Sequence, residues 1–258
     1  MSLLVGNVLE WVNEIAPFEK AESWDNVGLL CGSRNNEAKG ILCALDLTEE
    51  TLDEALSLNC NLIVTHHPIL FSGRKNMCED SAEGKLICRM VRANMNMIAA
   101  HTNYDAAPGG VNDCLANALG IRSAVPVEGD ADGLLRIGDI EPMTLRAFAD
   151  FAANALGDVV RVYGDRKKII RKAAVCGGAG GPYAKLALQA GADAYLTGEM
   201  RYHDSVDLVA EGLCTLHAGH DATERIAIKP MADGLQNRAN ALQYPLQVYV
   251  SNNMGVER

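Results

Sequence analysis

The feature that most constrains this fold is the alternation of short apolar runs with amphipathic helical patterns along the chain. These apolar runs are too short for buried helices, and most of them stand between segments with helical spacing. This alternation is typical of an α/β protein whose strands are mainly parallel. The predicted strands are residues 41–45, 62–65, 97–100, 134–137, 159–163, 173–176, 194–197, 215–217 and 247–250, and the predicted helices are residues 49–58, 83–93, 111–118, 144–156, 183–189, 205–211 and 223–235, after an amphipathic helix within residues 1–17.

The chain is long enough for two ordinary domains. It has 258 residues, of which 48% are hydrophobic, and this suffices for one large core or two smaller ones. The polar stretch 128–133 follows the first series of elements and is the best candidate linker. We therefore predict two interleaved three-layer α/β domains, residues 1–127 and 128–258, with a C-terminal segment able to pack back on the first domain.

Charge and cysteine usage narrow the class of protein. The formal net charge of −10 repels phosphate backbones, so we expect no general nucleic-acid binding. The 8 cysteines form no C-x-x-C pair and lie mostly in apolar stretches, which favours buried thiols in a reducing compartment. The N-terminal pattern differs from a signal peptide, and no apolar run reaches membrane-spanning length. We expect a cytoplasmic protein with no membrane partner.

Histidines gather where the predicted strands end. His66 and His67 close the run 62–65, and Pro68 stops the strand there, which allows both imidazoles to turn toward one place. Neutral imidazole is the commonest transition-metal ligand. For the bare pair, one core histidine beside one surface histidine is an equally good interpretation.

Two further clusters follow other predicted strands. His101 is followed four residues later by Asp105, and His220 is followed four residues later by Glu224 on what would be the first turn of a helix. Each pair alone is more typical of a surface contact. Open α/β sheets, however, place their sites at the carboxyl ends of strands, and three such clusters together predict a metal site.

The chain resembles a known family in five stretches that appear in the family's order and span most of the sequence. The family is the NIF-three-like dinuclear metal-centre family, whose members are often called GTP cyclohydrolase 1 type 2 homologues. This sequence resembles its short form, without the inserted middle domain. The matching stretches are residues 22–29 (ESWDNVGL), 65–68 (THHP), 101–105 (HTNYD), 195–199 (YLTGE) and 219–224 (GHDATE).

The resemblance implies two divalent metal ions in the cleft between the domains. The family's ligands fall on His66, His67, Asp105, His220 and Glu224, with Glu224 as the carboxylate that bridges the ions. This set suits zinc, iron, manganese, nickel or cobalt and fits calcium poorly. The family often has an aromatic residue or a second histidine where this chain has Asp221, which puts the surroundings of the site in doubt.

The resemblance also implies a function class and an assembly. We expect a metal-dependent hydrolase of a small molecule, which would include a nucleotide such as GTP, in a ring-shaped homohexamer. A water shared by two ions would lose its proton near neutral pH, with His101, Glu199 or His203 as proton shuttles or as structural hydrogen-bonding groups. The alternative is a non-enzymatic metal-handling or regulatory scaffold with the same ligands. The glycine-rich loop 177–181 predicts either a phosphate-binding loop or a tight β-α turn.

Overall fold

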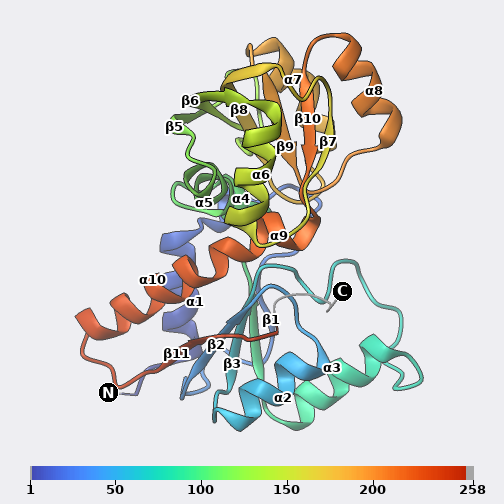
Figure 1. Ribbon diagram of the computed structural model, residues 1–258. Coiled ribbons are helices and arrows are strands. Elements are labelled where there is room, and N and C mark those ends of the chain that lie inside the picture. The colour runs from blue at the N-terminus through green and yellow to red at the C-terminus, as the bar shows by residue number, and fades with distance from the viewer. Residues whose placement is uncertain (1, 254–258) are drawn as a thin grey trace. The chain divides into compact units, whose positions relative to one another are not determined.

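A computed structural model describes residues 2–253 and divides the chain into two compact units (Figure 1). Unit 1 runs from the N-terminus to Ala107 and resumes at Ile228, whereas unit 2 spans Pro108–Ala227. Each unit holds one β-sheet with helices packed on it. The α/β class predicted from the alternating pattern is therefore confirmed.

The sheet of unit 1 is parallel except at one edge. Its strands lie in the order β1-β4-β3-β2-β11, and only β1 runs antiparallel to its neighbour among the described strands. Because β2, β3 and β4 are parallel, their carboxyl ends meet at the same edge of the sheet. The strands are β1 (Gly28–Cys31), β2 (Ile41–Ala44), β3 (Leu62–Thr65), β4 (Asn96–Ala99) and β11 (Val248–Val250).

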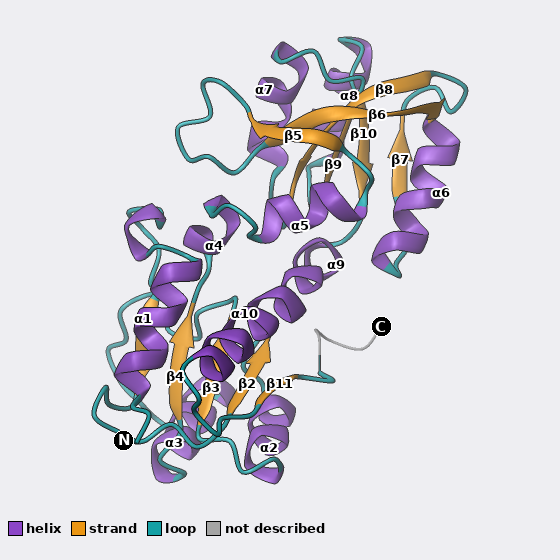
Figure 2. Ribbon diagram, turned by 90° about the vertical axis from the view of Figure 1, so that its left-hand side faces the viewer, coloured by secondary structure: helices purple, strands orange, loops and turns teal. Residues whose placement is uncertain are grey.

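Helices cover both faces of this sheet, so unit 1 has three layers (Figure 2). On one face, α2 (Glu49–Ser57) and α3 (Ala82–Arg92) bury Leu52 and Met90 against Ile63 of the central strand. On the other face lie α1 (Val5–Ile15) and α10 (Ile228–Ala241), which contact each other. A short helix, α4 (Thr102–Ala106), follows β4 at the carboxyl edge.

The sheet of unit 2 is mixed, which corrects the prediction of mainly parallel strands. Its order is β5-β6-β8-β9-β10-β7, in which β8, β9 and β10 are parallel to one another and the other pairings are antiparallel. A short loop joins β5 to β6, and strands connected in this way must pair antiparallel. The strands are β5 (Arg122–Pro126), β6 (Arg136–Thr144), β7 (Arg161–Tyr163), β8 (Ile169–Cys176), β9 (Ala194–Thr197) and β10 (Cys214–His217).

One face of this second sheet holds the core of unit 2. There α5 (Val111–Ala118) and α6 (Leu145–Leu156) bury Leu115 and Phe148 against strand residues that include Val175. The opposite face is covered by α7 (Ala184–Gln189) and α8 (Tyr202–Ala210) (Figures 1 and 2). Unit 2 is therefore also a three-layer α/β domain.

The division between the units differs from the predicted boundary at 127/128. That position lies inside unit 2, because α5 packs on β8 and Leu115 and Leu119 belong to the core of unit 2. The polar stretch 128–133 connects β5 with β6 and is a hairpin loop rather than a linker. The C-terminal segment returns to unit 1, where β11 pairs with β2.

The predicted helix 223–235 is in fact divided. The chain forms α9 (His220–Glu224), a 3₁₀ turn (Arg225–Ala227) and then α10. Pro230 lies in the first turn of α10, where proline is tolerated. A continuous helix from α9 would bring its ring into a clash with the backbone carbonyl four residues earlier, so the helix is interrupted. Elsewhere helix starts follow capping chemistry: the side chains of Thr48, Ser81 and Thr144 each accept a hydrogen bond from the amide three residues on.

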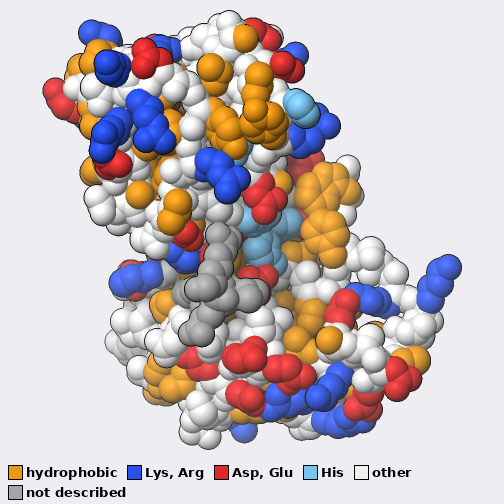
Figure 3. Space-filling view, turned by 45° about the vertical axis from the view of Figure 1, so that its right-hand side comes forward, with side chains coloured by type: hydrophobic (Ala, Val, Ile, Leu, Met, Phe, Trp, Pro, Cys, Tyr) orange, Lys and Arg blue, Asp and Glu red, His pale blue; other side chains and the backbone are white. Residues whose placement is uncertain are grey.

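The surface of the described residues is of mixed character. On the face drawn in Figure 3, acidic and basic side chains are interspersed, with hydrophobic side chains between them. Within residues 2–253, no helix is long and apolar enough to cross a membrane.

Candidate metal centre

Three imidazoles lie together at the carboxyl edge of the unit 1 sheet. His66 and His67 follow β3, and His101 follows β4. The ring centroid of His66 lies 5.0 Å from that of His67 and 5.1 Å from that of His101. One nitrogen from each ring lies within 4.8 Å of the others. The backbone turns sharply after each strand, so residues from two parallel strands reach the same point.

Each of these rings is held by an oxygen at its Nδ1 atom. Nδ1 of His66 is 3.0 Å from the Ala100 carbonyl oxygen, Nδ1 of His67 is 2.8 Å from Asp46 Oδ1, and Nδ1 of His101 is 2.9 Å from Asp25 Oδ1. Carbonyl and carboxylate oxygens only accept, so each Nδ1 is the hydrogen-bond donor, and in the neutral ring Nε2 is then the atom that can bind a metal. A metal-ligating histidine is normally oriented in this way.

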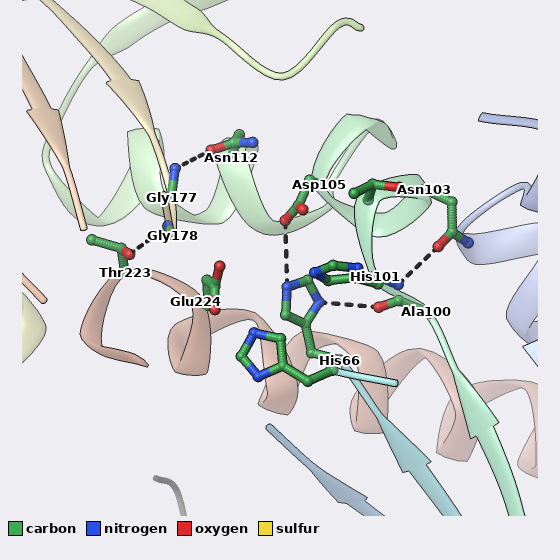
Figure 4. A network of polar contacts seen from close by, with 12 residues as sticks. His66, Ala100, His101, Asn103, Asp105, Asn112, Gly177, Gly178, Thr223 and Glu224 are labelled. Atoms are coloured by element: carbon green, nitrogen blue, oxygen red, sulfur yellow. Dashed lines mark hydrogen bonds and ion pairs between the residues drawn. The ribbon is translucent and has the colours of Figure 1, made fainter. Parts of the chain in front are cut away.

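Asp105 adds a carboxylate to this cluster from the short helix α4. Its Oδ1 atom lies 3.6 Å from Nε2 of His66 (Figure 4). Two ligand atoms that share a tetrahedral ion at about 2.1 Å each are about 3.4 Å apart. The start of α4 is fixed by Asn103, whose side chain accepts from the His101 amide and donates to the Ala16 carbonyl. The spacing between His66 and Asp105 therefore suits a shared cation.

Asp25 is the buried support beneath His101. Its side chain has no exposed surface. Burial alone would raise its pKa, but hydrogen bonds from His101 and Thr102 outweigh burial and lower the pKa to about 2. Asp25 is thus a fixed negative charge that orients His101.

Asp46 has a comparable position beside His67 and was missed by the sequence reasoning. It comes two residues after β2, at the same edge of the sheet as the histidines. A carboxylate just past a buried apolar run is a signal that the sequence itself contains. Its side chain is 39% exposed, so its hold on His67 is more accessible to water than that of Asp25 on His101.

Unit 2 carries a second, smaller cluster on α9. His220 and Glu224 lie one helical turn apart, with 3.2 Å between His220 Nε2 and Glu224 Oε1. Glu224 is only 4% exposed, although it is a carboxylate. Glu199, which follows β9, places Oε1 3.6 Å from the other nitrogen of His220. An acidic side chain therefore flanks each nitrogen of this imidazole.

The glycine-rich loop 177–181 packs directly against this cluster. Gly178 has φ +56°, and a Cβ atom there would lie 2.2 Å from Glu224 Oε1 and 3.2 Å from His220 Nε2. The Gly177 amide donates to Asn112 Oδ1 and the Gly178 amide to Thr223 Oγ1 (Figure 4). These two amides serve the fold of the loop, which favours the tight β-α turn over a phosphate cradle at this point.

Three further residues of unit 2, namely His203, His217 and Asp221, have contacts of their own. His203 is exposed on the first turn of α8, with its ring 5.3 Å from that of Tyr202. Nε2 of His217 lies 3.0 Å from Ser205 Oγ, and its ring is 4.8 Å from that of Tyr163, so His217 has a packing role. Asp221 on α9 forms an ion pair with Arg225, the first residue after that helix. Its charge is therefore partly balanced by Arg225.

The predicted ligands come from both units of the chain. His66, His67 and Asp105 belong to unit 1, with His101 beside them, whereas His220 and Glu224 belong to unit 2. Borderline divalent cations such as zinc, iron or manganese prefer this mixture of imidazole and carboxylate.

Comparison with known proteins agrees with this arrangement of motifs. The sequence profile of the Duf34/NIF3 (NGG1p interacting factor 3) family matches residues 3–254. The chain belongs to the Duf34/NIF3 family. A family member from Clostridium acetobutylicum, described as "GTP cyclohydrolase 1 type 2 homolog", is 33% identical over 260 residues, which cover 98% of this chain and 97% of the relative. The resemblance stated from the five motifs is confirmed.

Solved structures of Duf34/NIF3 relatives show the same fold. A hypothetical protein of Staphylococcus aureus superposes with a TM-score of 0.91 at 28% identity, covering 98% of this chain and 97% of that one. A Bacillus cereus protein related to NIF3 also superposes with a TM-score of 0.91, at 25% identity and with the same coverage. The α/β architecture is therefore shared with relatives over nearly the whole chain.

Proposed function

We propose that this Duf34/NIF3 protein binds two divalent metal ions and uses them to hydrolyse a small molecule, with nucleotides such as GTP as the first substrates to test. The proposed ligands are His66, His67 and Asp105 from unit 1 with His220 and Glu224 from unit 2. The nucleotide class comes from the description of relatives as GTP cyclohydrolase 1 type 2 homologues.

The observation that carries this proposal is the orientation and close spacing of the three imidazoles in unit 1. Their Nδ1 protons are engaged by Ala100, Asp46 and Asp25, and one nitrogen of each ring lies within 4.8 Å of the others. Histidines that only fill a core need not direct one nitrogen each toward a common point. A cation at that point would be bound by all three rings.

The carboxylates supply the charge that two cations require. Glu224 is buried and would act as the bridging ligand, because a carboxylate shared by two ions reduces their mutual repulsion. Bound divalent ions lower the pKa of a water that they share and polarise the bond to be cleaved. Glu199 would orient His220 through Nδ1, and its 63% exposed carboxylate is open to exchange protons with solvent.

His101 is suited to two roles at this site. One ring nitrogen of His101 lies within 4.8 Å of a nitrogen of His66 and of His67, so His101 would be a further ligand or the group that accepts a proton near the reacting atoms. Its hydrogen bond to ionised Asp25 stabilises the imidazolium that proton transfer would create. His203, which the sequence reasoning gave as a proton shuttle, stays a prediction.

The direct test is hydrolysis of GTP by metal-free and metal-reloaded protein. Purified protein is stripped with a chelator, and turnover is measured before and after adding zinc, manganese or iron. We expect turnover that the chelator abolishes and a divalent ion restores. A matched His66→Ala, Glu224→Ala double variant should have no activity, whereas His217→Gln should retain it.

A metal-replete protein that is inert on nucleoside triphosphates, cyclic amides and phosphoesters would favour the scaffold function instead. Turnover that persists in the double variant would refute the metal-dependent mechanism. The ring-shaped homohexamer implied by the resemblance stays a prediction, and sedimentation equilibrium of the purified chain tests it through the number of chains per particle.

A further inference from the structure

Two exposed aromatic side chains stand beside the imidazole cluster of unit 1. Trp24 is 56% exposed and Phe71 is 52% exposed. The two ring centroids are 5.6 Å apart. The centroid of His101 lies 6.2 Å from that of Trp24 and 6.0 Å from that of Phe71. Large aromatic side chains normally gain by burial. These two remain half in solvent directly next to the group expected to act in catalysis.

The loops that carry this aromatic pair are tied to each other and to the cluster. Asn26 Nδ2 donates to the Leu70 carbonyl oxygen at 2.5 Å, which links the Trp24 loop to the Phe71 loop. Asp25, the residue after Trp24, is bonded to both His101 and Thr102. The position of Trp24 is therefore fixed relative to His101 by its own neighbour in sequence.

The size and surroundings of the pair indicate its occupant. Of the residues next to these rings in sequence, Ser23 before Trp24 and Ser72 and Gly73 after Phe71 are polar or small and exposed, whereas Leu70 before Phe71 is apolar and partly buried. A protein interface of ordinary stability needs several hundred Å² from each partner. Two neighbouring aromatic side chains are far smaller than that and match a single planar ring.

We propose that Trp24 and Phe71 form a stacking platform that holds the planar heteroaromatic ring of the substrate, such as a nucleobase, next to His101. This inference rests on the proposed function and names the part of the substrate that the protein recognises. Aromatic faces stack on any base, so the platform selects for a flat ring rather than for one hydrogen-bonding pattern. The metal ligands and the platform are different residues, so their contributions can be separated.

Binding of GTP and of inorganic tripolyphosphate, which lacks the ring, tests the platform. Both are titrated by calorimetry into the metal-loaded full-length protein and its Trp24→Leu and Phe71→Leu variants. We expect each variant to raise the Kd for GTP about 10-fold, within the range for loss of a base-aromatic stack. The Kd for tripolyphosphate should stay within about 2-fold, and Trp24→Phe should recover most of the affinity for GTP. Phe151→Leu, a 42% exposed aromatic on α6, is the matched control and should change neither Kd.

Fluorescence gives an independent readout because the chain has only 2 tryptophans, Trp24 and the buried Trp11. We expect GTP to quench emission in the wild type but not in Trp24→Leu. Equal loss of affinity for both probes in Trp24→Leu and Phe71→Leu, or no loss for either, would overturn the platform. So would a wild type whose emission responds to none of the four common ribonucleoside triphosphates. Metal content and chelator-sensitive turnover are measured on the same samples, so failure of the platform is distinguishable from failure of the metal site.

Discussion

Asp25 accepts a hydrogen bond from Nδ1 of His101 at 2.9 Å, while its second oxygen accepts from the amide and the hydroxyl of Thr102. The carboxylate thus bonds the residue that carries the imidazole and the next residue of the chain. Because the side chain of Asp25 has no exposed surface, the direction of His101 is set by the fold and not by a mobile surface contact. This relationship connects the N-terminal motif 22–29 to the imidazole cluster of unit 1.

Replacing Asp25 with Asn should weaken metal binding at the unit 1 cluster. Asn keeps the shape but places an NH₂ group toward the Thr102 amide or toward His101, so at least one hydrogen bond is lost. We expect a metal affinity lower by about 10- to 100-fold, as for other residues that orient a ligating histidine. Competition with a chromophoric chelator measures it. Asp46→Asn is the comparison and should have a smaller effect, because water can replace a 39% exposed side chain; a larger effect at Asp46 would contradict this ranking.

Gly178→Ala should disturb the unit 2 cluster. The new methyl group would lie 2.2 Å from Glu224 Oε1, so the carboxylate must move away from His220. Gly191 also has positive φ, at +81°, but a Cβ atom there meets nothing within 4 Å, so Gly191→Ala reproduces the backbone strain alone. We expect both variants to lose about 1 kcal/mol or more of stability in urea unfolding, from left-handed backbone strain. Only Gly178→Ala should lose metal, and equal metal content in the two variants would show that the contact with Glu224 has no role.

His217 should make the stability of the metal-free protein depend on pH. Burial, and secondarily the charge of Arg161, lower the pKa of His217 below its usual value of 6.5. A depressed pKa means that the unfolded chain takes up the proton first, so the contribution to stability is full above pH 6.5 and is lost as the pH falls below it. The wild type should therefore lose more unfolding free energy between pH 7.5 and pH 5.5 than His217→Gln does. Urea titrations in the presence of a chelator measure the difference. Equal losses of unfolding free energy in the wild type and in His217→Gln would contradict a depressed pKa at His217.

The fold was largely predictable because periodicity reports burial. Strands such as β3, buried along their whole length, stand out in the sequence as continuous apolar runs. The strand β5 was missed, since its residues are mostly exposed and show no alternation. The domain boundary was misplaced for a related reason: a polar stretch marks a loop, but only packing shows which core the preceding helix α5 joins.

The proposed ligands of the candidate site could be predicted from the sequence better than the residues that support them. His66, Asp105 and His220 follow predicted strands and match family motifs, so local sequence sufficed to propose them. Asp46 is a support that depends on contact across two parallel strands, and sequence spacing does not show such contacts. The placement of Trp24 beside His101 is likewise a tertiary contact between distant segments.

The measurement that tests the account most directly is the number of metal ions per chain, determined by elemental analysis after saturation with zinc or manganese and removal of free metal. The wild type should hold close to two ions per chain, His66→Ala and Glu224→Ala should each hold fewer, and His203→Ala should match the wild type. At most one ion per wild-type chain, or unchanged content in both His66→Ala and Glu224→Ala, would contradict a dinuclear centre built from these residues.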